Sequence, residues 1–292
     1  MSASGAPDFE IEELGDGDLP QVVSLLCEGF PMRSPAYWRN GLARLGARTR
    51  PPTTEKYGYG LVSNGALAGV VLSIPSIHEG IDGPMALVNI SSWYARPAFR
   101  GPPAKELYRH ATRRDDVSYT NLSAAPHTIK TITAFGFREW SAGQVIAVSW
   151  HNEGSSPAAG RVLTTAQAEA AGLSAADGEV LADHERLGCL TLVVETDDGL
   201  SPLIFVRRRI KGLVPCAQLI YCRDLREVVD NGRRVGAALA RRGFPLLLVD
   251  ASGPVPGLTG RYVAAKASKY VKGPRPANAV DHLYSEMVLL GF

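Results

Sequence analysis

Two hydrophobic periods alternate along the first half of the chain. The apolar residues of segment 19–30 recur at helical spacing, and Asp16-Gly17-Asp18 before them is a helix start signal. Segments 57–63 and 66–74 have strand patterns, and Asn64-Gly65 between them is a strong hairpin turn. Further strands are expected at 9–14, 84–95, 118–123 and from 137 onward, and further helices at 37–45, 104–113 and 127–135.

The order of these elements predicts the fold class. An antiparallel hairpin stands in the middle of this half, and a strand–helix–strand unit follows it. That order favours an α/β fold with a mixed sheet, as in α+β proteins, and it disfavours a purely parallel sheet.

The second half repeats the pattern of the first. We expect helical structure at 164–184 with a break near Gly172, a helix at 225–241, and strands at 189–195, 202–208, 217–222, 245–250 and 283–292. The repetition predicts tandem modules. Segment 152–160 is rich in Gly, Ser and Pro and is the expected linker, so the chain divides into a disordered lead-in (1–8), module one (9–151) and module two (161–292).

Composition narrows the class of protein. A chain of 292 residues with 45% hydrophobic and 21% charged residues is typical of a soluble protein of two domains. Its net charge of +2 does not favour nucleic acid as a partner. No apolar run is long enough to span a membrane, and no secretory signal is visible. Cys27, Cys189, Cys216 and Cys222 lack zinc spacing, so we expect reduced, buried thiols, no metal and a cytoplasmic location.

Segment 88–101 carries the most specific motif. A strand runs into Arg96-Pro97-Ala98-Phe99-Arg100-Gly101, and a helix follows. This arrangement resembles the central motif of the GNAT acyl-CoA N-acyltransferase superfamily, and Asn121 with the later Phe135-Gly136-Phe137 resembles its second motif. The chain is also similar to bacterial two-module GNAT-like proteins, which share Trp93-Tyr94, Pro97-x-x-Arg100, Asp183-His184 and Leu283-Tyr284-Ser285-Glu286.

The resemblance implies tandem GNAT-like modules and acyl-CoA or acetyl-CoA as the co-substrate. It places the cofactor against Tyr94, Ala95, Arg96, Arg100, Gly101 and Asn121. A helix N-terminus supplies N–H groups to a diphosphate, glycine allows close approach, and arginine adds charge-assisted hydrogen bonds. Pro102 and Pro103 depart from the family pattern, because proline has no N–H to donate. Ile132 stands where many GNAT enzymes have the tyrosine that protonates the leaving thiolate.

Four residues are the candidates for acid–base chemistry. Tyr94 lies on the motif strand, and His127 precedes a helix near the expected site. Alternation along residues 281–286 places His282, Tyr284 and Glu286 on one strand face, which would suit an active-site wall. Tyr284 and Glu286 are the other two candidates, with Glu286 as base for an incoming amine. Packing, capping and a half-exposed strand are the structural alternatives for these residues.

Two further regions have two interpretations each. The basic run 207–211 fits a solvated edge strand or a site for an anionic substrate. Segments 257–262 and 266–273 are rich in Gly, Lys and Tyr, and they fit a surface loop or a lid over a pocket between the modules.

Three functions are compatible with these patterns. The first is an acyltransferase that moves an acyl group from acyl-CoA, or another acyl thioester, to a small-molecule amine or hydroxyl acceptor between the modules. The second is a non-catalytic protein of the same fold that binds a ligand or a protein. The third is a transferase that uses aminoacyl-tRNA, which the weak positive charge does not favour.

Overall fold

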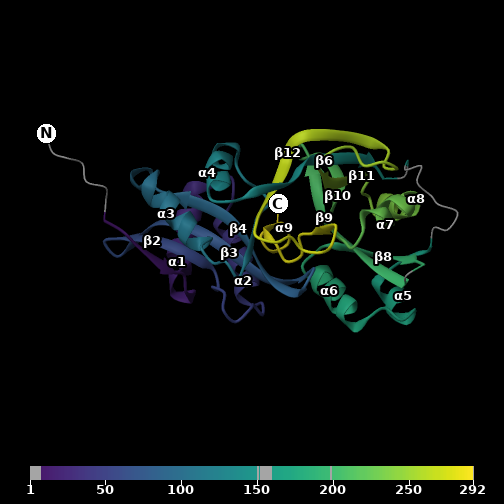
Figure 1. Cartoon of the computed structure of the whole chain (residues 1–292), viewed down its shortest axis with the longest axis horizontal. Helices are drawn as coiled ribbons and strands as arrows, with labels where there is room; N and C mark the ends of the chain where they lie inside the picture. Colours follow the sequence, from purple (N-terminus) through teal and green to yellow (C-terminus); the bar gives the residue numbers. More distant parts are fainter. Residues whose placement is uncertain (1–7, 150, 152–159, 198, 292) are drawn as a thin grey trace.

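The computed structural model describes residues 8–149, 151, 160–197 and 199–291. All but the last residue of the expected lead-in 1–8, and all but the last residue of the expected linker 152–160, lie outside this range. The described chain is elongated, and Figure 1 shows its first half (purple to blue) and its second half (green to yellow) side by side along the long axis.

Thirteen strands of the described residues form one mixed sheet. From one edge the order is β1, β2, β3, β4, β5, β12, β6, β11, β10, β9, β8 and β7, and β13 pairs with β10. The strands are β1 (Glu10–Glu13), β2 (Gly58–Ser63), β3 (Ala66–Gly80), β4 (Gly83–Ala95), β5 (Ser118–Asn121), β6 (Arg138–Val148), β7 (Val162–Leu163), β8 (Leu190–Thr196), β9 (Gly199–Ile210), β10 (Val214–Cys222), β11 (Leu246–Ala251), β12 (Gly260–Lys272) and β13 (Val280–Asp281).

The two halves of the chain exchange strands at the centre of this sheet. β12 from the second half pairs with β5 on one side and with β6 on the other, and β6 pairs in turn with β11. Figure 1 shows β12 as the long yellow strand that crosses the upper middle of the molecule. The predicted mixed sheet is confirmed, and both halves share it. The division into modules at 152–160 stays a prediction.

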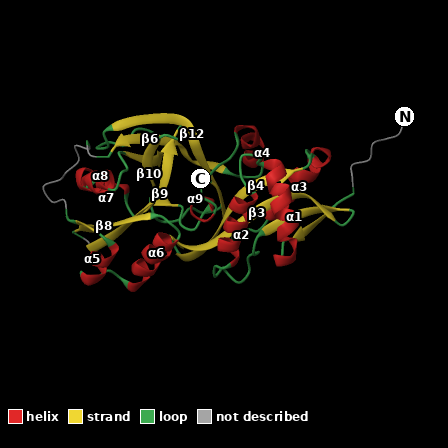
Figure 2. Ribbon diagram, turned by 180° about the vertical axis from the view of Figure 1, so that it is seen from behind, coloured by secondary structure: helices red, strands yellow, loops and turns green. Residues whose placement is uncertain are grey.

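Helices cover both faces of the sheet (Figure 2). In the first half α1 (Leu19–Gly29) and α2 (Pro35–Gly46) pack on one face, and α3 (Pro102–Ala111) and α4 (Ile129–Ala134) pack on the other. β3 serves both cores, because Val70 and Leu72 join the first core while Val71 joins the second. In the second half α5 (Thr165–Ala170) and α6 (Ala175–Arg186) lie opposite α7 (Leu225–Asp230) and α8 (Gly232–Arg241).

Two expectations for the second half are wrong. The helix expected at 225–241 is two helices, because the chain turns at Asn231, whose side-chain amide donates to the Glu227 carbonyl oxygen at 3.0 Å. Residues 260–262 and 266–272 of the segments expected as loops at 257–262 and 266–273 belong to β12. Pairing with a strand on each side overrides the weak strand propensity of their Gly, Lys and Ser residues.

The strand expected at 283–292 is also wrong, because this segment contains the short helix α9 (Glu286–Leu289). His282, Tyr284 and Glu286 therefore do not share a strand face. The segment ends in a short apolar run whose length and composition fit a buried helix as well as a strand. The core around it decides the outcome.

Segment 286–291 is buried between the two halves. Met287 and Val288 join the core beneath α6, while Leu289 and Leu290 join the core of α1 and α2. A Cβ on Gly41 of α2 would lie 2.5 Å from the Leu290 Cδ2 atom, so a side chain at this position would require the Leu290 side chain to shift. The packing fixes the position of Glu286, the first residue of α9.

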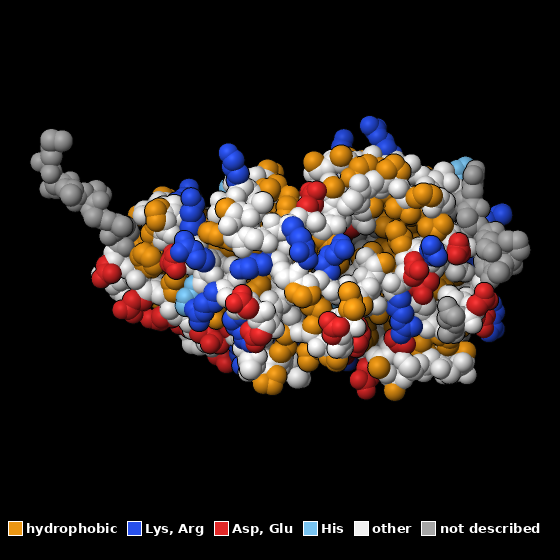
Figure 3. Space-filling view, viewed as in Figure 1, with side chains coloured by type: hydrophobic (Ala, Val, Ile, Leu, Met, Phe, Trp, Pro, Cys, Tyr) orange, Lys and Arg blue, Asp and Glu red, His pale blue; other side chains and the backbone are white. Residues whose placement is uncertain are grey.

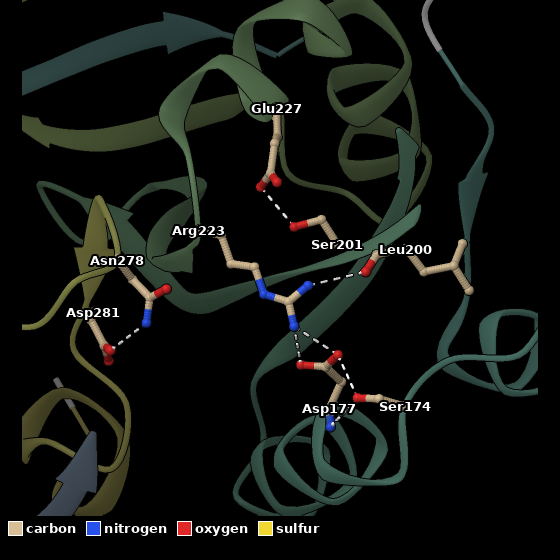
Figure 4. A network of polar contacts seen from close by, with 8 residues as sticks. All are labelled: Ser174, Asp177, Leu200, Ser201, Arg223, Glu227, Asn278 and Asp281. Atoms are coloured by element: carbon tan, nitrogen blue, oxygen red, sulfur yellow. Dashed lines mark hydrogen bonds and ion pairs between the residues drawn. The ribbon is translucent and has the colours of Figure 1, made fainter. Parts of the chain in front are cut away.

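Arg223 ties α6 to the sheet of the second half (Figure 4). Its Nη2 atom donates to both carboxylate oxygens of Asp177 at 2.6 and 2.8 Å, and its Nη1 atom donates to the Leu200 carbonyl oxygen at 3.2 Å. Asn278 donates to the Asp281 Oδ2 atom at 3.0 Å on the other side of this view. These contacts anchor α6 and β13, which flank segment 286–291.

Candidate active site

The sheet forks between β4 and β5. The two strands pair in parallel only where residues 87–89 face residues 118–120, and the ladder then ends while β4 continues to Ala95. Asn89 stands at the fork: its Oδ1 atom accepts from the Glu286 amide at 2.8 Å, and its Nδ2 atom donates to the Thr120 carbonyl oxygen at 3.4 Å. The fork leaves room between the strands for a ligand.

A bulge shapes β4 beyond the fork. The register with β3 passes from Leu72 opposite Ser91 to Val70 opposite Tyr94, so Ser92 and Trp93 have no paired position. Ser92 has a φ of 54°, a left-handed conformation that a serine adopts only at some cost. Both bulge residues line the cavity between the strands.

Three cavities follow one another through the fork. The outer cavity, of about 570 Å³, lies between the end of β4, the start of α3 and α4. The fork cavity, of about 280 Å³, lies between the bulge and residues 121–125. The basic cavity, of about 560 Å³, lies between residues 122–124, β9, β10 and β12. The outer and fork cavities share Phe30, Trp93, Ala125 and Thr128, and the fork and basic cavities share Ser123 and Ala124.

Glu286 lines the fork cavity and is 1% exposed. Its Oε2 atom accepts a hydrogen bond from the Ser91 hydroxyl, and its Oε1 atom has no hydrogen-bond partner among the described residues. Burial raises the pKa of Glu286 above its usual range, although the Ser91 and Ser123 hydroxyls and the Lys269 charge act in the opposite direction. A carboxylate of this kind is suited to accept a proton from a reactant in the cavity.

The start of α3 opens onto the outer cavity. Gly101 caps the helix with a φ of 99°, which glycine adopts readily. Pro102 and Pro103 occupy the first helical positions without N–H groups, so the first turn offers the amides of Gly101 and Ala104. The exposed basic or titratable side chains around this cavity are Arg100, Lys105 and His127. Amides at a helix start and nearby cations suit a phosphorylated ligand.

Most of the predicted site residues meet at these cavities. Tyr94 and Ala95 line the outer cavity with Arg100, Gly101 and His127, whereas Asn121 and Glu286 line the fork cavity. The Tyr94 ring lies so close to Gly29 that a Cβ on this glycine would be 2.4 Å from it, and the Arg100 guanidinium lies 5.8 Å from the centre of the ring. Asn121 donates to the Tyr108 hydroxyl oxygen at 3.2 Å.

Arg96 and Tyr284 lie outside the three cavities. The Arg96 guanidinium donates to the two carboxylate oxygens of Glu28 at 3.0 and 2.8 Å. The Tyr284 hydroxyl donates to the Asp183 Oδ2 atom at 2.9 Å, and the Arg48 guanidinium lies 4.2 Å from the centre of the Tyr284 ring. Because both side chains are engaged elsewhere, we assign neither of them a role in the site.

The structure also brings together a Ser–His–Asp set that sequence spacing did not reveal. The Ser76 Oγ atom is 2.8 Å from His78 Nε2, and His78 Nδ1 is 2.7 Å from Asp281 Oδ1, across 203 residues of sequence. All three residues are buried, and none of them lines the three cavities of the fork. We therefore interpret the set as a tie between β3 and β13 and not as a nucleophilic site.

A second buried polar cluster lies beside the basic cavity. The Lys269 Nζ atom donates to the Leu122 carbonyl oxygen at 2.6 Å and lies 4.0 Å from the Asp250 Oδ2 atom. Gln218 donates to the same oxygen at 3.1 Å. Burial acts to raise the pKa of Asp250, but the neighbouring Lys269 and His282 hold it below its usual range. Lys269 thereby fixes one wall of the fork.

Clustered metal ligands and cysteine thiols are two further features that bear on the chemistry of the described residues. Residues 8–149, 151, 160–197 and 199–291 contain no group of three or more His, Cys, Asp or Glu side chains that could hold a metal ion. Cys216 lines the basic cavity, but burial raises the pKa of its thiol, which keeps it protonated near neutral pH. In the same described ranges, no helix has the length and apolar character to cross a membrane.

No protein-family model matches the chain, and no curated protein matches it. Solved structures do. A GCN5-related N-acetyltransferase from Anabaena variabilis is 11% identical, with a TM-score of 0.58 over 90% of this chain and 72% of that one. One from Kribbella flavida is 11% identical, with a TM-score of 0.54 over 92% and 72%. A putative acetyltransferase from Pyrococcus horikoshii is 11% identical, with a TM-score of 0.53 over 98% and 95%. The chain therefore has the fold of the GCN5-related N-acetyltransferases, the superfamily that its strand–turn–helix motif resembles.

Proposed function

We propose that this protein is an acyltransferase that moves an acyl group from acyl-CoA, or another acyl thioester, to an amine. The observation that carries the proposal is the continuous run of three cavities through the sheet fork, with the carboxylate of Glu286 in the middle one. The fold supports it, because the solved neighbours include GCN5-related N-acetyltransferases.

Each cavity has a distinct part in this proposal. The diphosphate of the donor would bind at the start of α3, near Gly101 and Arg100. The thioester would reach the bulge of β4, where Ser92 and Trp93 line the cavity and their backbone N–H groups would polarise its carbonyl oxygen. The acceptor would approach from the basic cavity on the opposite side.

The transfer step needs one proton carrier. The neutral amine nitrogen attacks the thioester carbonyl carbon, a C–N bond forms, and the C–S bond breaks. Glu286 takes the proton that the nitrogen loses and returns it to the leaving thiolate, so the step is balanced in atoms and charge. Because Ile132 offers no proton at the position of the usual tyrosine, Glu286 serves as base and then as acid.

Ligand-induced stabilisation tests the proposal. Acetyl-CoA, longer acyl-CoAs and free CoA are each added to the protein, and thermal unfolding is measured. A ligand at 100 times its dissociation constant adds about 2.7 kcal/mol to the free energy of unfolding. No stabilisation by any of them, in a protein that unfolds cooperatively, would overturn the proposal.

A matched pair of variants locates the effect. Thr128 lines both the outer and the fork cavities, whereas Thr133 is an exposed residue of α4 that lines neither cavity. Both hydroxyls donate to a backbone carbonyl at 2.8 Å, so the two sites are comparable. Thr128→Trp should fill the cavities and abolish the stabilisation by acyl-CoA, and Thr133→Trp should preserve it. Equal responses of the two variants would place the binding site elsewhere.

A further inference from the structure

Two further cavities lie away from the fork, at the opposite end of the parallel pair of β4 and β5. The mouth cavity, of about 790 Å³, lies between residues 80–86, residues 115–118, the start of β6 and residues 274–279. The inner cavity, of about 180 Å³, adjoins it and shares Trp140 and Arg275 with it. On the face that Figure 3 shows, basic and acidic side chains both occur along the whole molecule, so surface charge there does not single out a site. Buried polar groups are the better guide.

Hydrogen bonds hold segment 273–279, part of which lines both cavities. The Ala277 amide donates to the Glu79 carbonyl oxygen at 2.8 Å, and the Arg138 guanidinium donates to the Gly273 carbonyl oxygen at 3.0 Å. The protein itself therefore keeps this wall in place. A wall of this kind lowers the entropic cost of binding a ligand, because little has to be ordered on binding.

The inner cavity is lined by buried side chains with unpartnered polar atoms. His282 and Ser141 both line it, and their exposed fractions are 3% and 7%. Neither the His282 Nδ1 atom nor the Ser141 Oγ atom has a hydrogen-bond partner among the described residues. A buried polar atom without a partner costs free energy, so native proteins rarely keep one without a reason. The two atoms point to a polar ligand.

Asp250, the acidic residue that lines the inner cavity, is already engaged. Its two carboxylate oxygens accept from the Gln218 amide at 3.2 and 3.1 Å, and the Lys269 Nζ atom lies 4.0 Å from the Oδ2 atom. The His282 Nε2 atom lies 3.4 Å from the same oxygen, which orients the imidazole ring. Asp250 therefore serves the protein itself and has little capacity left for a ligand.

Three other polar groups of the inner cavity can act as donors. Arg275 is exposed and forms no hydrogen bond or ion pair with another described residue. The Ser141 hydroxyl can donate, and His282 donates from both ring nitrogens in its protonated form. A guanidinium donates two parallel hydrogen bonds to a carboxylate, so this set of donors suits a carboxylate.

The mouth cavity restricts the rest of the ligand. Its lining includes the half-buried Trp140 and also Ile81, which is 88% exposed at the turn between β3 and β4. An apolar body would remove part of this surface from water. Asp82 and Asp115 line the same cavity, and neither forms an ion pair with another described residue. A second anionic group in the ligand would therefore be repelled.

We propose that the two cavities bind a small monocarboxylate with an apolar body, whose carboxylate meets Arg275, Ser141 and His282 while the body lies in the mouth cavity. The site is distinct from the fork, because Lys269 is the one described residue that lines both the inner cavity and a cavity of the fork. The inference does not depend on the proposed acyl transfer.

Calorimetric titration of the full-length protein tests the inference. The probes are butanoate, benzoate and 3-phenylpropanoate, each compared with its own amide, and butanoate is also compared with succinate. We expect the preferred carboxylate to bind at least about tenfold more tightly than its amide, since the amide loses the charge-assisted hydrogen bonds, and we expect succinate to bind more weakly than butanoate. No binding of any carboxylate, or equal affinity for acids and amides, would overturn the inference.

Three variants locate the carboxylate. Arg275→Gln and Ser141→Ala should each lower the affinity for the preferred carboxylate about tenfold or more, whereas Arg261→Gln, at an exposed arginine of β12 that lines neither cavity, should keep it. Ser141→Ala should be no less stable in urea than the wild type, because it removes a buried hydroxyl that has no partner. Its lower affinity would then not reflect a loss of folding. Equal affinities in Arg275→Gln and Arg261→Gln would overturn the inference.

A competition measurement separates this site from the proposed active site. Thiol release from acetyl-CoA is measured with a panel of small primary amines, in the presence and absence of the preferred carboxylate. The carboxylate should not compete with the amine. Competitive inhibition against the amine would place the carboxylate in the fork and overturn the inference. If no amine supports thiol release, the acyltransferase proposal fails, and the calorimetric titrations still decide whether the carboxylate site exists.

Discussion

Replacement of Glu286 by Gln tests the chemistry without changing the shape of the site. Glutamine can still accept the hydrogen bond of Ser91 through its amide oxygen, but it cannot take a proton. General base catalysis contributes about 10²–10⁴-fold, so kcat should fall by that factor, which corresponds to about 2.7–5.4 kcal/mol in the barrier. Acyl-CoA should stabilise the variant as well as it stabilises the wild type, because the change leaves the outer cavity intact.

The same variant should gain stability, which separates a catalytic carboxylate from a structural one. Burial raises the pKa of Glu286, so its contribution to stability is full below the pKa of an unfolded glutamate and is lost as pH rises through the folded pKa. The neutral glutamine avoids this loss, and each unit by which the pKa is raised is worth about 1.4 kcal/mol. Above the folded pKa, Glu286→Gln should therefore have the higher free energy of unfolding.

Two assays measure these effects. Thiol release gives kcat and KM, and urea unfolding at a series of pH values gives the free energy of unfolding, with Glu139→Gln as a control at an exposed glutamate of β6. An unchanged kcat in Glu286→Gln would refute the role as base. A variant less stable than the wild type at pH values above the folded pKa of Glu286 would refute the account of a buried, destabilising charge.

Three further predictions concern the surroundings of the site. Burial lowers the pKa of His184 to about 4, whereas an unfolded histidine has a pKa of about 6.5, so between these two pH values only the unfolded chain takes up the proton. As the pH is lowered through this window, the free energy of unfolding should fall by up to about 1.4 kcal/mol per pH unit. Urea unfolding of His184→Gln should lack this slope, and parallel curves for the variant and the wild type would contradict the prediction. In Gly41→Val the new side chain should collide with Leu290 and displace Glu286, so kcat should fall while acyl-CoA binding changes little. If Gly41→Val keeps the kcat of the wild type, segment 286–291 does not position the base. Asp250→Asn leaves Lys269 buried without a carboxylate and should lower the free energy of unfolding in urea by about 3–5 kcal/mol. Adding Lys269→Met to this variant should restore most of the lost stability. Equal losses of stability in the single and the double variant would count against the pairing of Asp250 with Lys269.

The sequence predicts those parts of the fold whose signals are local. The helix at α1, the hairpin turn at Asn64-Gly65 and the strand–turn–helix around Arg100 and Gly101 each carry their own periodicity or turn chemistry, and the structure has all of them. The mixed sheet follows from their order. The position of β12 between β5 and β6 does not, because its residues have little strand propensity and are ordered by partners more than a hundred residues away.

The candidate site shows the same division. Tyr94, Arg100, Gly101 and Asn121 lie close to one motif, so a single stretch of sequence could point to them. The sequence points to Glu286 through the alternation of a strand that the structure does not contain, and the side chain instead meets Ser91, 195 residues earlier. Arg208 and Lys266 line the basic cavity from two separate strands, which no local pattern connects.

The amine-dependent release of free thiol from acetyl-CoA tests the central claim most directly, when the amide product is identified by mass in the same samples. The account predicts that thiol release rises with the concentration of an amine of the panel, that one amide forms for each thiol released, and that Glu286→Gln removes most of the activity. Acetyl-CoA that binds but yields neither thiol nor amide with any amine of the panel would contradict the account and leave a ligand-binding protein with this fold.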